Sequence, residues 1–171
     1  MSEPEFSRPV RLDTIGAGSR TIEIAAERDE RTALARRFGL LALKQLGASA
    51  ELVRLGEEVS ATGRLRAEVE QPCVASGEPV PATIDEPFAL RFIPEGETSG
   101  EEIELDEDDL DVLPYTGGAI DLGEAVAQTL ALALDPFPRS ADAEAALRAA
   151  GVIDEEEAGP FSALKALRDR L

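Results

Sequence analysis

The chain has 171 residues, of which 43% are hydrophobic, with 35 acidic and 17 basic residues, no histidine and one cysteine. This length is sufficient for one hydrophobic core without disulfide support. The formal charge of -18 opposes binding of polyphosphate over most of the surface. No apolar run approaches the roughly 20 residues of a membrane-spanning helix, and the N-terminus lacks the cationic and apolar pattern of a signal segment. We therefore expect a cytoplasmic protein with no membrane segment.

Charge is distributed unevenly along the sequence. Residues 1–70 carry 11 basic and 12 acidic residues, whereas residues 71–171 carry 6 and 23. Acidic surfaces repel the phosphates of nucleic acids and attract basic partners. We therefore expect the second half to favour a basic protein partner, and any contact with nucleic acid to come from arginines of the first half.

The first 56 residues contain short segments separated by turn-forming glycines. Short apolar runs favour strands, and an acidic residue ahead of a helical segment favours an N-cap. These patterns predict strands over 8–12 and 20–25, followed by a helix that Asp29 caps and that ends at about Phe38. Two further strands are predicted over 40–46, ending at Gly47, and over 50–55, ending at Gly56.

The clearest periodicity lies between residues 58 and 92. Apolar and polar residues alternate over 58–69, and the pattern returns over 80–92 with one break at Glu86. Alternation of this length is typical of a half-buried strand. We expect two long antiparallel strands, joined by residues 71–78, which supply the proline and glycine that end ladders and permit turns.

The remaining part of the chain contains an acidic segment followed by helical patterns. Residues 94–119 have too few apolar side chains for a core, so we expect an acidic flexible linker that includes an edge strand near 111–115. Three helices are predicted. In the first, over 121–134, Asp121 and Glu124 form a capping box, and Pro136 and Pro138 follow its end; in the second, over 140–150, Ser140 is the cap and Gly151 the terminator. The third lies over 160–171.

Together these elements predict a single α+β domain over residues 1–171. We expect a strongly curved or barrel-like antiparallel sheet of long strands with three to four packed helices. The acidic linker at about 94–119 and the C-terminal helix at about 160–171 accompany this domain. Strand order and oligomeric state do not follow from the pattern.

The sequence contains few groups that support catalysis. The absence of histidine excludes Ser-His-Asp and Cys-His sites, His-bearing zinc sites and the usual proton shuttle near neutral pH. Cys73 can be a nucleophile that uses another base, half of a metal site, or a small apolar side chain at the end of a hairpin, and the last is favoured. We expect no catalytic residues, no cofactor and no metal, and therefore no enzyme.

The acidic run over 101–111 is a second candidate for chemistry. It lacks the mid-loop glycine and the ligand alternation of an EF-hand, so a solvated linker or attraction of a basic partner is favoured. The rival interpretation is a carboxylate metal-dependent hydrolase that uses, for example, Asp106 and Asp109. A flexible segment does not hold carboxylates with the precision that catalysis requires.

Two arginine clusters are the candidates for contact with RNA or a partner. Arg64 and Arg66 share the polar face of the predicted strand over 58–69, and Arg36 and Arg37 belong to the predicted helix before Phe38. Acidic residues flank both clusters, so solvated, ion-paired faces are the competing interpretation. The aromatic residues of the second long strand lie on its apolar side, which argues against stacking on bases.

Three segments in succession resemble the YceD-type family of large ribosomal RNA subunit accumulation proteins. The first joins Gly63-Arg-Leu-Arg-Ala-Glu-Val to Cys73-Val-Ala-Ser-Gly-Glu-Pro79, where many family members carry Cys-x-x-Cys-Gly-x-Pro. The second, over 120–138, is an Asp-Leu pair, an amphipathic helix and Pro-x-Pro, and the third is the ending Gly159-Pro-Phe with its lysine-containing helix. The motif residues are Gly63, Cys73, Gly77, Pro79, Asp121, Leu122, Pro136 and Pro138.

The resemblance implies a non-enzymatic factor that supports accumulation, processing or assembly of large-subunit ribosomal RNA. We expect it to bind a basic ribosomal or assembly protein, and large-subunit rRNA, if at all, through Arg36, Arg37, Arg64 and Arg66. Ser76 stands where the second cysteine of the commoner motif would be, so Cys73 is interpreted as structural. A generic acidic interaction module without a ribosomal role is the alternative that composition alone permits.

Overall fold

The computed structural model describes residues 4–16, 18–96 and 111–152. Within this part, the chain packs into two compact units. The larger unit contains the described residues up to Gln71 together with Pro81–Asp135, and the smaller unit contains Pro72–Val80 and the described residues from Pro136 onward.

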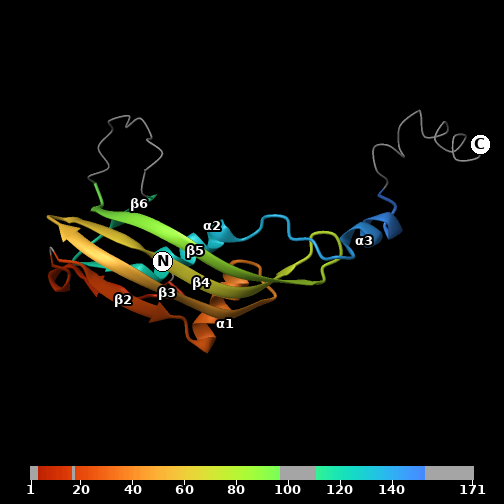
Figure 1. The fold of residues 1–171 in the computed structure, drawn as a ribbon, viewed down its shortest axis with the longest axis horizontal. Coiled ribbons are helices and arrows are strands. Elements are labelled where there is room, and N and C mark those ends of the chain that lie inside the picture. The colour runs from red at the N-terminus through yellow and green to blue at the C-terminus, as the bar shows by residue number, and fades with distance from the viewer. Residues whose placement is uncertain (1–3, 17, 97–110, 153–171) are drawn as a thin grey trace, which may run out of the picture. The chain divides into compact units, whose positions relative to one another are not determined.

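Figure 1 shows the helices and strands of the described chain. Their bounds are β1 (Pro9–Arg11), a 3-10 turn η1 (Leu12–Thr14), β2 (Arg20–Ala25), α1 (Arg28–Arg37), β3 (Ala42–Leu55), β4 (Glu58–Pro72), β5 (Pro79–Pro94), β6 (Asp111–Tyr115), β7 (Ala119–Asp121), α2 (Leu122–Ala133) and α3 (Ala143–Ala149). The α+β class is confirmed, as are the predicted strands over 8–12, 20–25, 58–69 and 80–92 and the edge strand near 111–115.

Five strands form one sheet in the order β2-β3-β4-β5-β6, and β1 and β7 form a second, two-stranded sheet. β3 is antiparallel to both β2 and β4, whereas β6 is parallel to β5. A parallel neighbour requires a connection of a dozen or more residues, which the chain between Pro94 and Asp111 supplies. The prediction of a wholly antiparallel sheet is therefore wrong at β6. Since β2 and β6 are the two edges, the described strands form no closed barrel.

The two strands predicted over 40–46 and 50–55 are one continuous strand, β3. Gly47 lies within it and does not end it. A Cβ atom at residue 47 would lie 3.3 Å from the Ile24 carbonyl oxygen, so glycine permits the close approach of β2. The turn comes at Gly56, whose φ of +65° suits glycine.

Burial follows the predicted alternation of the long strands. One face of the sheet carries the buried side chains, and we call it the inner face; the opposite face, which carries Arg64 and Arg66, is the outer face. The inner-face core of β4 and β5 comprises Val59, Ala61, Leu65, Ala67, Val69, Ile84, Phe88, Leu90 and Phe92. At Gly63 a Cβ atom would lie 2.2 Å from the Ser49 carbonyl oxygen and 2.8 Å from the Phe88 ring.

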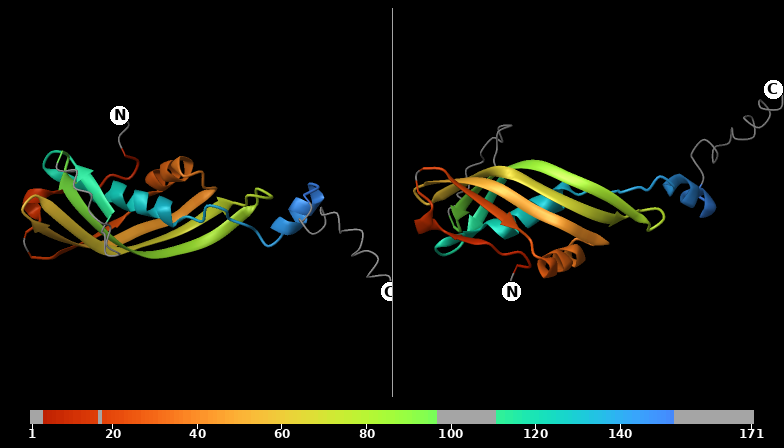
Figure 2. Two further views of the ribbon diagram at one scale, coloured as in Figure 1. Left: turned by 90° about the horizontal axis from the view of Figure 1, so that it is seen from above. Right: turned by 60° about the horizontal axis from the view of Figure 1, so that its bottom comes forward.

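Helices α1 and α2 both lie over the inner face, which the strands curve around (Figure 2). Their buried residues, which include Leu34 of α1 and Leu122 and Leu130 of α2, join the same core as the strands. The outer face carries no helix among the described elements. Two helices therefore pack on the sheet, and α3 belongs to the smaller unit.

The start of α1 differs from the prediction. Glu27 and not Asp29 is the N-cap, because Glu27 and Glu30 form a capping box in which the Glu30 carboxylate accepts from the Glu27 backbone N–H at 2.7 Å. Asp29 lies in the first turn, where its charge is favourable next to the helix N-terminus.

The start of α2 agrees with the prediction in its N-cap but not in the capping box, because the Glu124 carboxylate binds Arg37 and Gln128. Asp121 is the N-cap, and its Oδ1 accepts from the Glu124 backbone N–H at 3.1 Å. The same carboxylate accepts from the Arg8 backbone N–H at 2.8 Å and from the Ser7 hydroxyl at 2.6 Å. Gly123 permits this contact, because a Cβ atom there would lie 2.4 Å from the Phe6 carbonyl oxygen. The α2 N-terminus is thus fastened to the N-terminal segment.

The smaller unit contains the turn over 73–78 and α3. Ser140 does not cap α3, whose N-cap is Asp142; the Ser140 backbone and hydroxyl groups point at Cys73 instead. Gly151 follows the helix at a φ of +83°, as expected of a terminator. The predicted helix over 160–171 and residues 97–110 of the linker lie outside the described residues.

Candidate interaction surface

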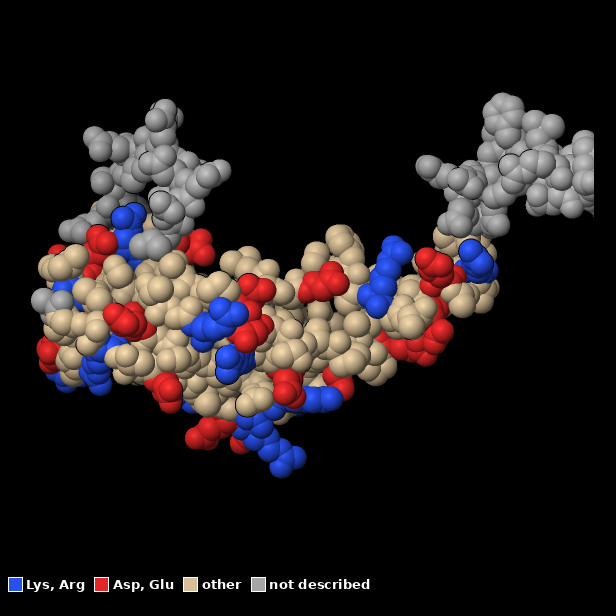
Figure 3. Space-filling view, viewed as in Figure 1, with Lys and Arg blue, Asp and Glu red and all other residues tan. Residues whose placement is uncertain are grey.

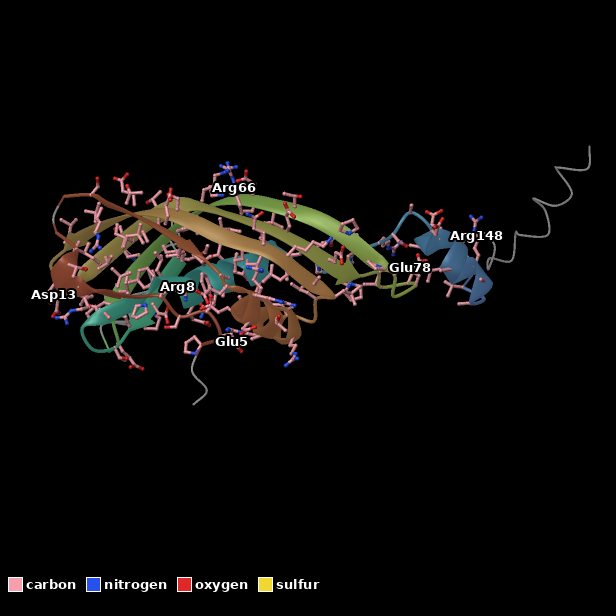
Figure 4. All side chains as sticks on the ribbon, turned by 90° about the horizontal axis from the view of Figure 1, so that it is seen from below. Glu5, Arg8, Asp13, Arg66, Glu78 and Arg148 are labelled. Carbon is pink, nitrogen blue, oxygen red and sulfur yellow. The ribbon has the colours of Figure 1, made fainter. Side chains whose placement is uncertain are left out.

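The strand register arranges outer-face residues in rows across the sheet. Glu23, Ser49 and Arg64 form one row, and Ala25, Gly47 and Arg66 form the next. Figure 4 shows Arg66 on the outer side and Arg8 and Glu5 on the opposite side of the strands.

Asp85 of β5 binds both of the outer-face arginines that the sequence identified. Its carboxylate accepts from Arg64 Nε and, at 3.2 Å, from Arg66 Nε, and its backbone carbonyl accepts from Arg64 Nη2 at 3.2 Å. These hydrogen bonds, with that of Arg64 the strongest cause, lower the pKa of Asp85. A phosphate group that approached either arginine would have to compete with a carboxylate already in place.

A hollow of about 560 Å³ lies next to these arginines on the outer face. Glu23 of β2 is on one side of it, Arg64 and Arg66 of β4 are on the other, and the small residues Gly47 and Ser49 of β3 lie between. The hollow exists because Gly47 and Ser49, the β3 residues at its centre, are small, and Gln45 of β3 also lines it. Its opposite sides carry opposite charges.

Two further outer-face cations are paired with carboxylates. Lys44 Nζ lies 2.5 Å from Glu70 Oε1, and Arg91 Nε lies 3.9 Å from Glu58 Oε1. The first pair raises the pKa of Lys44, chiefly through its hydrogen bond to Glu70. Figure 3 shows acidic and basic side chains interspersed over one face of the molecule, without an extended basic patch among the described residues on that face.

The arginines of α1 do not join those of the outer face, because α1 lies on the inner side of the sheet. Arg37 is held between two carboxylates: Nη1 lies 2.9 Å from Glu5 Oε2, and Nη2 lies 2.7 Å from Glu124 Oε1. These contacts raise the pKa of Arg37, chiefly through Glu124, and lower that of Glu124. Arg36 is exposed, and within the described chain no carboxylate pairs with it.

Arg8 is a structural residue that sequence reasoning missed. Its guanidinium forms two hydrogen bonds to the Glu30 carboxylate, at 2.6 and 2.8 Å, and a third to the Ala25 carbonyl oxygen at 3.0 Å. It also lies over the Phe6 ring at 4.6 Å. The N-terminal segment is thereby joined to β2 and α1. No periodic signal relates residues so far apart, so the contact could not be read from the pattern.

In the smaller unit, Cys73 is surrounded by hydrogen-bonding groups. The Ser140 backbone N–H and hydroxyl donate to Sγ at 3.3 and 3.5 Å, and Ser140 Oγ lies 3.4 Å from Ser76 Oγ and from Glu78 Oε2. The turn over 73–77 is closed by the Gly77 N–H, which donates to the Cys73 carbonyl at 2.8 Å with Gly77 at a φ of +75°.

These hydrogen bonds give the Cys73 thiol an acidic character that the sequence did not suggest. Ser140, through its hydroxyl and then its N–H, and Ser76 lower the pKa of the thiol to about 6. Cys73 is 3% exposed, but burial raises the pKa of its thiol less than the hydrogen bond from the Ser140 side chain lowers it. The interpretation of Cys73 as an apolar filler therefore omits its polar contacts.

Several motif residues have clear structural roles. Gly63 lies where a Cβ atom would clash with β3, and Gly77 has a positive φ. Asp121 caps α2, and Leu122 is completely buried. Pro136 and Pro138 follow the end of α2, the Pro138 carbonyl accepts from the Val74 N–H at 2.9 Å, and Pro79 begins β5. These observations assign the motif to the fold.

Among the described residues, no three or more Cys, Asp or Glu side chains are placed to hold a metal ion. Asp106 and Asp109 lie outside the described residues. None of the described helices has the length and apolar character needed to cross a membrane.

The fold and surface define an α+β protein with an open five-stranded sheet, one face of which carries paired charges and is covered by none of the described helices. Residues 61–168 match the family described as Large ribosomal RNA subunit accumulation protein YceD. The chain belongs to this family, and the resemblance of its three segments is confirmed. No curated protein and no solved structure matches the chain. The family name suggests a role in accumulation of large-subunit ribosomal RNA.

Proposed function

We propose that this protein supports accumulation of large-subunit ribosomal RNA in the cytoplasm as a binding factor and not as an enzyme. Its partner is a basic ribosomal or assembly protein. Family membership supports the ribosomal role, and the absence of histidine, with a single thiol, supports a function by binding.

The observation that carries the choice of a basic partner is the pairing of the candidate arginines. Asp85 occupies Arg64 and Arg66, and Glu5 and Glu124 occupy Arg37. Releasing such a cation for a phosphate requires breaking an ion pair, which offsets part of the gain from counterion release. Direct contact with rRNA is therefore secondary to protein binding. Of the four candidate arginines, Arg36 is the one that no carboxylate of the described chain pairs with.

The acidic surplus supports the same conclusion. Exposed carboxylates such as Glu23 and Glu51 lie on the outer face, and within the described residues no lysine or arginine pairs with them. The sequence adds eight acidic and no basic residues over 97–110. Such a field speeds association with a basic partner and loses strength as salt rises.

The decisive experiment for the ribosomal role is deletion of the gene and measurement of the ratio of large-subunit to small-subunit rRNA. A fall in the ratio, restored by the intact gene, is expected. An unchanged ratio would favour a generic acidic interaction module without a ribosomal role.

The nature of the partner is tested with purified components. Individual large-subunit ribosomal proteins and rRNA fragments are titrated onto the full chain over a salt series. We expect at least one basic protein to bind more tightly than any RNA fragment. An RNA fragment that binds more tightly than every protein, and whose affinity falls with rising salt as expected for several phosphate contacts, would make rRNA the main partner.

A further inference from the structure

The two edges of the five-stranded sheet differ in their capacity to bind another strand. Among the described strands, β2 is one edge over its whole length, while on the other side β6 covers β5 only from Leu90 onward. β5 carries Pro81 and Pro87 along its uncovered part, and β2 contains no proline. Proline lacks the N–H that an added strand would use, and it protects sheet edges.

The hydrogen-bonding direction of β2 follows from one bond beside it. The Ala26 N–H donates to the Leu46 carbonyl at 2.9 Å, and antiparallel pairing alternates, so even-numbered residues of β2 face β3. Thr21, Glu23 and Ala25 then direct their backbone groups away from the sheet. The Ala25 carbonyl confirms this direction, because it accepts from Arg8. Thr21 and Glu23 keep an outward N–H and C=O, and Ala25 an outward N–H.

The side chains of β2 indicate which types of side chain an added strand should have. On the outer side its central residue is Glu23, which is exposed and borders the hollow over Gly47 and Ser49. On the inner side Ile22 and Ile24 are partly buried against the core. A neighbouring strand about 4.8 Å away would place alternate side chains opposite these two sets.

We propose that the β2 edge is a docking site for an extended segment of a basic protein in which lysine or arginine alternates with apolar residues. The partner strand hydrogen-bonds to Thr21, Glu23 and Ala25, as in β-strand addition to other sheets. Its cationic side chains lie on the outer face next to Glu23, where the hollow accommodates an aliphatic stem, and its apolar side chains extend the core beside Ile22 and Ile24. The identity of the occupant as a basic protein rests on the proposed function.

The test uses the full chain and a synthetic peptide of alternating valine and lysine with blocked ends, followed by fluorescence anisotropy. Thr21→Pro removes an outward N–H without touching the β2–β3 ladder, and we expect about tenfold weaker binding. Thr83→Pro is the matched control on the proline-bearing β5 edge and should bind as the unchanged protein does. Equal affinity of Thr21→Pro, or no binding of the peptide to the unchanged protein, would overturn the proposal.

A second pair of variants decides the question if Thr21→Pro does not fold. Glu23→Lys should weaken peptide binding about fivefold, whereas Glu86→Lys on β5 should not change it. A peptide of alternating valine and glutamate should not bind, and equal binding of this peptide contradicts the proposal.

A dimer that Thr21→Pro converts to a monomer would show that a second copy occupies the edge, which also overturns the proposal. Peptide binding together with an unchanged rRNA ratio after gene deletion would refute the ribosomal role and leave the docking site intact.

Discussion

Arg8 and Glu30 form a two-pronged ion pair, with Nη1–Oε1 at 2.6 Å and Nη2–Oε2 at 2.8 Å. Both side chains are less than one third exposed. Because the same guanidinium also binds the Ala25 carbonyl, this pair joins the N-terminal segment, β2 and α1 at one point.

The first prediction concerns this pair. Arg8→Ala should destabilise the protein by about 1–3 kcal/mol, because it removes charge-assisted hydrogen bonds and leaves a partly buried carboxylate without its partner. Urea unfolding at pH 7 measures the effect. Arg11→Ala is the control: its pair with Asp13 is largely exposed, and its loss should leave the unfolding midpoint unchanged. Equal effects of the two variants would contradict the structural role of Arg8.

The second prediction is the pH dependence of that stabilisation. The hydrogen bond from Arg8 lowers the pKa of Glu30 in the folded protein. A carboxyl group with a lower pKa when folded stabilises the fold fully above its unfolded pKa of about 4.3, and the stabilisation is lost as the pH falls through the lower, folded value. The difference in unfolding free energy between the unchanged protein and Arg8→Ala should therefore narrow below about pH 4.3. A difference that stays constant down to full protonation would exclude this account.

The third prediction concerns Gly63. A Cβ atom there would approach the Ser49 carbonyl oxygen to 2.2 Å and the Phe88 ring to 2.8 Å, so Gly63→Ala requires β3 or the ring to move. We expect a loss of about 2–3 kcal/mol, which is in the range of overpacked cores. Thermal unfolding is the measurement, and Gly118→Ala, which has open space around the new methyl group, is the control. A fully stable Gly63→Ala variant would contradict the close approach of the strands.

The fourth prediction concerns the Cys73 thiol. Thiolate absorbance should titrate with a midpoint of about 6 in the folded protein, and near 8.5 in urea. Since the pKa is lowered on folding, this group stabilises the fold fully above its unfolded pKa and less as the pH falls through about 6. Ser140→Ala should raise the midpoint more than Ser76→Ala, because Ser140 is the larger cause of the shift. A midpoint near 8.5 in the folded protein would disprove the hydrogen-bonded thiolate.

The fifth prediction tests whether Asp85 restrains RNA binding. Asp85→Asn leaves Arg64 and Arg66 without a carboxylate partner, so affinity for an rRNA fragment should rise and the salt dependence should steepen by about 0.7–0.9 per added phosphate contact. Asp13→Asn, which frees Arg11, is the control for a simple change of net charge. Equal gains in the two variants would mean that the outer face has no particular capacity for RNA.

The sequence was sufficient for elements that depend on local patterns. Alternation identified β4 and β5 because each side chain of a half-buried strand meets either core or solvent. The N-cap at Asp121 was predictable because its donor and acceptor are three residues apart. At Gly47 the local signal failed, since glycine marks a turn and a close strand approach equally well.

Contacts between distant segments were not predictable in this way. Asp85 meets Arg64 and Arg66 only through the order of the strands, and Ser140 meets Cys73 across a separation of 67 residues. The parallel course of β6 depends on the path of a long connection, and no periodicity encodes that path. The candidate arginines were therefore found, but their carboxylate partners were not.

The pairing of Pro9 in β1 with Asp121 in β7 has a consequence for synthesis of the chain. The Asp121 carboxylate accepts from the Arg8 backbone N–H across 113 residues, so the N-terminal segment cannot form this contact until Asp121 has been translated. At about 5–20 residues per second, synthesis of these 113 residues takes roughly 6–23 seconds. During that time Val10 lacks Ile120, its partner in β7, and this part of the core stays incomplete until late in synthesis.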